Sequence, residues 1–178
     1  MLRPCLFLDR DGIIIQDTGY PFRESDLVLI PEVLPLIRWA KQKGWFVIVV
    51  SNQSGVARGI FTEQDLETFT EHLKHRLREE GGEPDAWYYC PFHEKGSVEA
   101  YKMKSDLRKP RPGLVLKALS DFPIDLEKSI MVGDKLSDVI ELDGLKTFLI
   151  GGRYPLDPYP HVFSSHPDLL AFLKIEFP

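Results

Sequence analysis

Cysteine is scarce in this chain: Cys5 and Cys90 are its only two, and neither stands in a paired spacing typical of metal or redox sites. This excludes a disulfide framework and is typical of a reducing cytosol. Long apolar runs are also missing, since the longest, residues 45–50, is far too short to cross a bilayer. No basic segment followed by a long apolar run marks a signal peptide. We therefore expect a cytoplasmic protein without membrane partners.

An excess of positive charge is absent as well. The chain has 22 Lys and Arg residues against 27 Asp and Glu residues, which gives a formal net charge of −5. General nucleic-acid binders normally carry a basic surface, so we expect no nucleic-acid partner, although a local cluster of cations could still bind a small anion. The 178 residues, 43% of them hydrophobic, suit a single domain over residues 1–178, and we expect a monomer.

Short apolar segments alternate with helical patterns along the chain. The expected strands are 5–8, 45–50, 86–89, 129–132 and 147–150. The expected helices are 31–43, 62–80, one that begins at Pro112, a short one after 134 to about 143, and 167–174, while 13–30 forms an irregular flap or hairpin. This alternation predicts an α/β fold, with a doubly wound parallel sheet of about five strands and helices on both faces.

Polar side chains follow three of the expected strands. Asp9 ends the first strand, Ser51 the second and Asp134 the fourth. Ligands of open parallel sheets bind beyond the carboxyl ends of the strands. We therefore expect these three side chains to belong to one site.

Asp9 and Asp11 are separated by one residue, so in an extended chain both side chains can point toward one pocket. Two carboxylates at ~4 Å repel by a few kcal/mol at an effective dielectric of ~20, and a divalent cation removes that penalty. One carboxylate can accept a phosphoryl group as nucleophile, and the other can serve as general acid and base. The alternative is two turn-capping aspartates, because Asp-x-Asp-Gly is also ordinary turn chemistry.

Three further motifs can bind phosphate or metal. Ser51 and the backbone N–H groups after it can bind phosphate oxygens, and Arg58 adds a cation. Lys109 can neutralise a transferring phosphoryl group, while Asp134 can complete a metal site and Asp138 can hold its surroundings in place. The alternatives are a polar turn, a solvated basic loop and two acids at a helix N-terminus. The order of the motifs along the chain favours one catalytic site.

Together these motifs resemble those of the haloacid dehalogenase superfamily of phosphatases, and they span residues 9–138. In particular, they look like the branch that contains the D-glycero-D-manno-heptose 1,7-bisphosphate phosphatases and the histidinol-phosphate phosphatases. The segments that carry this resemblance are Asp9–Gly12, Gly19–Tyr20, Ser51–Gly59, Arg108–Pro110 and Gly133–Lys135. Cys90–Pro91 and Gly96–Glu99 are also similar to a loop of the heptose enzymes.

The resemblance implies a Rossmann-like sheet with almost no cap domain and a magnesium-dependent phosphatase. By position, it makes Asp9 the nucleophile and Asp11 the general acid and base. It places Mg²⁺ on Asp9, the Asp11 carbonyl and Asp134, with Asp138 in a supporting role. The implied phosphate ligands are Ser51 and Lys109, and the candidates for positioning the substrate are Asn52, Arg58, Arg108 and Lys135.

The chain departs from this branch in its zinc ligands. The branch binds structural zinc through a Cys-x-His pair and a later Cys-x-Cys pair. Here Cys90 is kept, but Phe92, Ser105 and Leu107 replace the other three ligands, and His93 is one position late. Structural zinc normally needs four ligands, so we predict no zinc and apolar packing of the loop in its place.

The resemblance predicts a small phosphorylated metabolite as substrate, most specifically heptose 1,7-bisphosphate of lipopolysaccharide precursor synthesis. Histidinol phosphate is the alternative, and so is a broad range of phosphate esters. A bisphosphate would need a second cation, whereas the cationic histidinol would need a carboxylate such as Glu24 or Asp26 of the flap. A non-enzyme alternative is an inactive phosphate-binding scaffold protein on the same fold.

Overall fold

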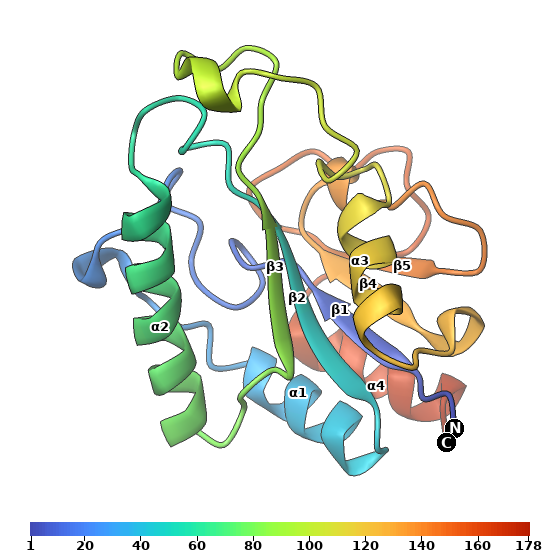
Figure 1. Ribbon diagram of the computed structural model, residues 1–178. Coiled ribbons are helices and arrows are strands. Elements are labelled where there is room, and N and C mark those ends of the chain that lie inside the picture. Colours follow the sequence, from blue (N-terminus) through green and yellow to red (C-terminus); the bar gives the residue numbers. More distant parts are fainter.

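Six parallel strands form one sheet at the centre of the protein (Figure 1). The computed structural model describes residues 1–178. The strands are β1 (Cys5–Leu8), β2 (Phe46–Asn52), β3 (Ala86–Cys90), β4 (Ile130–Gly133), β5 (Lys146–Ile150) and β6 (Val162–Phe163). Their order across the sheet is β3-β2-β1-β4-β5-β6, and every neighbouring pair is parallel. The predicted parallel α/β fold is confirmed.

Helices cover both faces of this sheet. They are α1 (Val33–Gln42), α2 (Glu63–Glu79), α3 (Gly113–Asp121) and α4 (His166–Glu176). Side chains of α1, α2 and α4 share one core cluster with Leu6 and Leu8 of β1. Side chains of α3 share a second cluster with Cys5 and Phe7 of the same strand. Because successive residues of β1 point to opposite faces, this central strand is apolar throughout and buried on both sides.

The start of α2 shows how local sequence fixes an element. Thr62 is the residue before the helix, and its Oγ1 accepts a hydrogen bond of 3.1 Å from the backbone N–H of Asp65. In return, Asp65 Oδ2 accepts the backbone N–H of Thr62 at 2.8 Å. This capping box satisfies two otherwise unpaired donors, as the sequence predicts.

Two expectations about the C-terminal half are wrong. A sixth strand is present, because Val162 and Phe163 pair with Leu149 and Ile150 of β5. Two residues are too short to show an alternating pattern, so the sequence gives no signal for this strand. The helix expected after Asp134 is reduced to one 3-10 turn, Leu136–Asp138. The side chain of Asp138 points inward and accepts the backbone N–H groups of Asp134 and Lys135, which closes the turn on itself.

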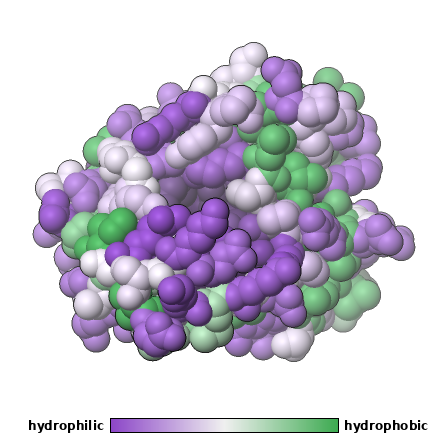
Figure 2. Space-filling model, turned by 90° about the horizontal axis from the view of Figure 1, so that it is seen from above, coloured by the Kyte–Doolittle hydropathy of each residue, from purple (hydrophilic) through white to green (hydrophobic).

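The carboxyl ends of the strands meet on one face of the molecule. Viewed from above, that face is hollowed between hydrophilic side chains (Figure 2). The segment between β1 and α1 contains only a short 3-10 helix, Glu24–Asp26, and isolated bridges, so it leaves the hollow open.

None of the helices combines the length and the apolar character that crossing a membrane would require.

Candidate active site

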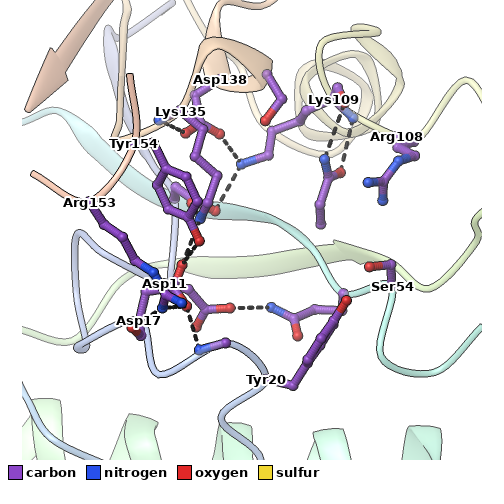
Figure 3. Close-up of a pocket in the computed structure, with 15 residues that line it drawn as sticks. Asp11, Asp17, Tyr20, Ser54, Arg108, Lys109, Lys135, Asp138, Arg153 and Tyr154 are labelled. Atoms are coloured by element: carbon purple, nitrogen blue, oxygen red, sulfur yellow. Dashed lines mark hydrogen bonds and ion pairs between the residues drawn. The ribbon is translucent and has the colours of Figure 1, made fainter. Parts of the chain in front are cut away.

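A polar cavity of about 350 Å³ lies at this edge of the sheet. Its lining contains Asp9, which directly follows β1, and Lys109 from the segment before α3. Figure 3 shows Lys109 reaching into the cavity. Its walls include Asn52 at the end of β2, Lys135 after β4, and Arg108. The structure therefore brings together residues that the sequence places at the ends of three different strands.

The ammonium group of Lys109 joins two buried carboxylates. Its Nζ donates to Asp9 Oδ1 at 2.8 Å and to Asp138 Oδ1 at 2.6 Å, and the whole residue is only 3% exposed. Burial alone would lower the pKa of Lys109, but the two carboxylates raise it by more, so the amine stays charged. A charged lysine beside Asp9 can also neutralise a phosphoryl group bound there.

Asp138 supports the turn that follows β4. Its Oδ2 accepts the backbone N–H groups of Asp134 and Lys135, each at 3.1 Å. Gly133 makes room for this carboxylate, because a Cβ at that position would lie 2.2 Å from Asp138 Oδ2. With Lys109 and the backbone as partners, both oxygens of Asp138 are occupied, which fits the predicted supporting role rather than that of a free ligand.

Asp9 and Asp134 are suited to hold a divalent cation. Carboxylate oxygens of Asp9, Asp134 and Asp138 lie within 4.8 Å of one another. Asp134 Oδ1 is buried without a hydrogen-bond partner, and only the ammonium of Lys135, 3.2 Å away, offsets its charge. Burial, followed by the charge of Asp9, raises the pKa of Asp134 to about 7. A buried carboxylate oxygen without a hydrogen-bond partner, close to a second carboxylate, fits a hard cation such as Mg²⁺.

Gly12 allows this approach of the carboxylates. Its φ of +88° is in the region that favours glycine, and a Cβ there would lie 2.1 Å from Asp134 Oδ2. The sequence Asp-x-Asp-Gly is therefore needed for space as well as for its acids. The roles predicted for the Asp11 carbonyl and for Asp134 as metal ligands stay predictions.

Asp11 lies in the same cavity and is held by neighbours that the sequence analysis does not identify. Arg10 donates to its two oxygens from Nε at 2.7 Å and from Nη2 at 3.0 Å. Gln53 Nε2 donates to Asp11 Oδ2 at 3.2 Å. Arg10 is itself buried and also donates to the carbonyl of Pro21, so it links Asp11 to the part of the flap around Pro21.

The predicted phosphate and substrate ligands at the end of β2 and just beyond it are placed differently from one another. Asn52 holds the backbone of Lys109, accepting its N–H at 3.0 Å and donating to its carbonyl at 3.1 Å. Ser51 is buried outside the cavity lining, and its Oγ accepts a hydrogen bond of 2.6 Å from Gln53 Nε2. Arg58 is exposed outside the cavity, 3.3 Å from the ring of His93. Phosphate binding by Ser51 and substrate binding by Arg58 stay predictions.

The loop that lacks the zinc ligands packs through apolar groups. Phe92 and Leu107 contact the core cluster under α3, and the rings of Phe92 and Tyr101 are 6.0 Å apart. The thiol of Cys90 lies 3.8 Å from the carbonyl oxygen of Phe92. Tyr101 Oη donates to Glu63 of α2 at 2.6 Å, which fastens the loop at a second point. The expected apolar packing is present, and the absence of zinc stays a prediction.

Comparison with known proteins agrees with this geometry. The family model described as polynucleotide kinase 3 phosphatase matches residues 6–147. The chain belongs to this phosphatase family, within the haloacid dehalogenase superfamily. The chain is 45% identical over 136 residues to D-glycero-beta-D-manno-heptose-1,7-bisphosphate 7-phosphatase of Escherichia coli. The match covers 76% of this chain and 71% of that relative.

Two further relatives extend the comparison. The D-glycero-alpha-D-manno-heptose-1,7-bisphosphate 7-phosphatase of Burkholderia mallei is 41% identical over 139 residues, which cover 78% of this chain and 74% of the relative. The structure of D,D-heptose 1,7-bisphosphate phosphatase from B. bronchiseptica, complexed with magnesium and phosphate, superposes with a TM-score of 0.77 at 26% identity. That match covers 97% of this chain and 99% of the other. The resemblance identified from the motifs is confirmed.

The buried ammonium of Lys109 is expected to be essential for stability. In Lys109→Met two buried carboxylates lose their common cation, so the free energy of unfolding should fall by about 3–5 kcal/mol in urea denaturation followed by circular dichroism. Lys128→Met is the matched control, because it breaks an exposed pair with Asp125 and should cost less than about 1 kcal/mol. Equal losses in the two variants would contradict this role of Lys109.

Magnesium is expected to stabilise the folded protein through Asp134. A ligand at a hundredfold excess over its Kd adds about 2.7 kcal/mol, so MgCl₂ should raise the melting temperature relative to EDTA in differential scanning calorimetry. Asp134→Asn should abolish this shift, whereas Asp121→Asn, at an exposed carboxylate of α3, should keep it. An undiminished shift in Asp134→Asn would exclude Asp134 as a ligand.

Proposed function

We propose that this chain is a magnesium-dependent phosphomonoester hydrolase that forms an aspartyl-phosphate on Asp9. The observation that carries the proposal is the asymmetry of this buried carboxylate. Oδ1 of Asp9 accepts a hydrogen bond from Lys109, whereas no hydrogen bond reaches Oδ2, which lies 3.9 Å from the ammonium of Lys135. A fixed carboxylate with one free oxygen in a polar cavity is suited to attack phosphorus.

The reaction follows from the positions of Asp9 and Asp11. Asp9 Oδ2 attacks the phosphorus while the bond from phosphorus to the leaving alcohol breaks, and Asp11 gives a proton to that alcohol oxygen. Asp11 then takes a proton from water, which attacks the phosphorus, releases phosphate and restores the carboxylate of Asp9. The ion pair with Arg10 holds the carboxyl group of Asp11 in place beside the reacting atoms. Mg²⁺ bound by Asp9 and Asp134 would offset the charge of the phosphoryl oxygens.

The proposed substrate is D-glycero-D-manno-heptose 1,7-bisphosphate, with hydrolysis of its 7-phosphate. The names of the similar proteins support this assignment, and so does Arg108 in the cavity wall. Its guanidinium is partly buried, and Nη1 has no hydrogen-bond partner. Unpaired guanidinium N–H groups close to the floor of the cavity suit the second phosphate of a bisphosphate.

Histidinol phosphate is disfavoured by the placement of the acids. Glu24, one carboxylate expected to attract a cationic substrate, lines a separate groove beside α2. Asp26, the other, accepts the backbone N–H groups of Phe22 and Arg23 and does not line the cavity. A scaffold without activity is disfavoured by membership of the phosphatase family and by the presence of Asp9, Asp11 and Lys109 in one cavity.

Phosphate release from a panel of esters tests this proposal. We expect magnesium-dependent turnover of heptose 1,7-bisphosphate with kcat/KM at least about tenfold above that of fructose 1,6-bisphosphate and histidinol phosphate. EDTA should abolish it. The panel should include both heptose anomers, because relatives named for each anomer are similar to this chain.

Asp9→Asn is the decisive variant in this assay. It preserves the shape of the side chain but removes the nucleophilic charge, so phosphate release should fall to background while circular dichroism stays unchanged. Asp121→Asn, which lies outside the cavity, serves as the control. Persistent turnover in Asp9→Asn would reject the aspartyl-phosphate, and similar slow rates on all esters would reject the heptose substrate.

A further inference from the structure

One wall of the cavity is built by residues that belong to no recognised motif. Asp17 comes from the flap after β1, while Arg153 and Tyr154 come from the loop between β5 and β6. More than 130 residues separate Asp17 from the other two, yet Figure 3 shows Arg153 and Tyr154 reaching toward Asp17 at one side of the cavity. This wall therefore depends on a contact between two segments without regular structure.

Asp17 fastens the two segments together. Its Oδ2 accepts a hydrogen bond of 2.7 Å from the hydroxyl of Tyr154, and its Oδ1 accepts the backbone N–H of Gly19 at 2.8 Å. Arg153 Nη1 donates to the carbonyl oxygen of Asp17 at 2.7 Å. The side chain of Asp17 is only 6% exposed, and each of its two oxygens accepts a hydrogen bond within the protein. Buried polar groups that are fully paired hold a single conformation.

The same carboxylate is coupled to the reaction centre through Lys135. The Nζ of Lys135 lies 3.1 Å from Asp17 Oδ2 and 3.2 Å from Asp134 Oδ1. It also lies 4.7 Å from the centre of the Tyr154 ring, within the range of a cation–π contact. Asp17, Tyr154 and Asp134 thus all lie around the ammonium group of Lys135.

Arg153 keeps unpaired donors at this wall. Only Nη1 of its guanidinium makes hydrogen bonds within the protein, and its side chain is 55% exposed. The remaining N–H groups belong to a residue that lines the cavity. Hydroxyl and phosphate oxygens are the natural acceptors for such a group.

We propose that Asp17 is a positioning residue that fastens the loop of residues 151–160 through Tyr154, and that Arg153 thereby contacts the oxygen-rich, non-reacting part of the substrate. The inference rests on the proposed function in one respect, because it takes a sugar bisphosphate as that substrate. It adds a specificity determinant in a region that the catalytic motifs do not cover. Arg108 and Arg153 then contact the substrate from two different loops.

Tyr154→Phe is the sharpest test, because it removes the hydroxyl that binds Asp17 and keeps the ring beside Lys135. The readout is the ratio of kcat/KM for heptose 1,7-bisphosphate to kcat/KM for p-nitrophenyl phosphate, which has no hydroxyl groups or second phosphate. We expect this ratio to fall about tenfold, mainly through KM for the sugar. Tyr159→Phe is the matched control in the same loop: its hydroxyl donates to the Thr147 carbonyl away from the cavity, and the ratio should not change.

Limited trypsin digestion tests the fastening without any activity. Cleavage after Arg153, identified by mass spectrometry, should be several times faster in Tyr154→Phe and Asp17→Asn than in wild type or Tyr159→Phe, because the loop opens more often. Wild-type rates of cleavage in both variants would overturn the fastening. Faster cleavage with an unchanged kcat/KM ratio would overturn the substrate contact.

The two proposals fail in different ways. If the wild type turns over p-nitrophenyl phosphate but no sugar bisphosphate, the proposed substrate is wrong, and the proposed contact of Arg153 with it is wrong as well. Cleavage after Arg153 then still decides whether Asp17 fastens the loop. If the wild type hydrolyses the heptose compound and Tyr154→Phe behaves like Tyr159→Phe in both assays, only the inference about Asp17 is wrong.

Discussion

The site depends on one buried ammonium group placed between two carboxylates. Lys109 lies between Asp9 at the end of β1 and Asp138 beyond β4, in a region that little water reaches. Without this cation the two buried acids would repel each other at low dielectric. Asn52 holds the backbone of Lys109 from the end of β2, so a single residue ties together the ends of three neighbouring strands.

The proposed chemistry and the proposed choice of substrate use different parts of the site. Asp9 directly follows β1, and Lys109, from the loop before α3, is held by buried ion pairs with Asp9 and Asp138. Arg108 and Arg153 of the cavity wall lie on loops without such buried pairs. Similar proteins named for alpha and for beta heptose bisphosphates fit this division, because such enzymes can share one reaction centre and differ in their walls.

The parts that could be predicted from sequence are those with local signals. Buried parallel strands appear as continuous apolar runs, so β1 and its terminal Asp9 are found from a few residues. β6 could not be found, because two residues carry no period. The pairing of Asp17 with Tyr154 was missed for another reason: it joins two irregular segments, and nothing local to either one specifies the other. Ser51 shows a third limit, since sequence places it beside the cavity but not the direction of its side chain.

Trapping of the covalent intermediate tests directly whether Asp9 is the nucleophile. Borohydride reduces an acyl phosphate to an alcohol, so quenching the protein during turnover and sequencing its peptides by mass spectrometry locates the phosphorylated carboxylate. We expect homoserine in place of Asp9, in a reaction that requires substrate and magnesium. Reduction at another carboxylate, or none during confirmed turnover, would contradict a mechanism based on the carboxylate that Lys109 holds.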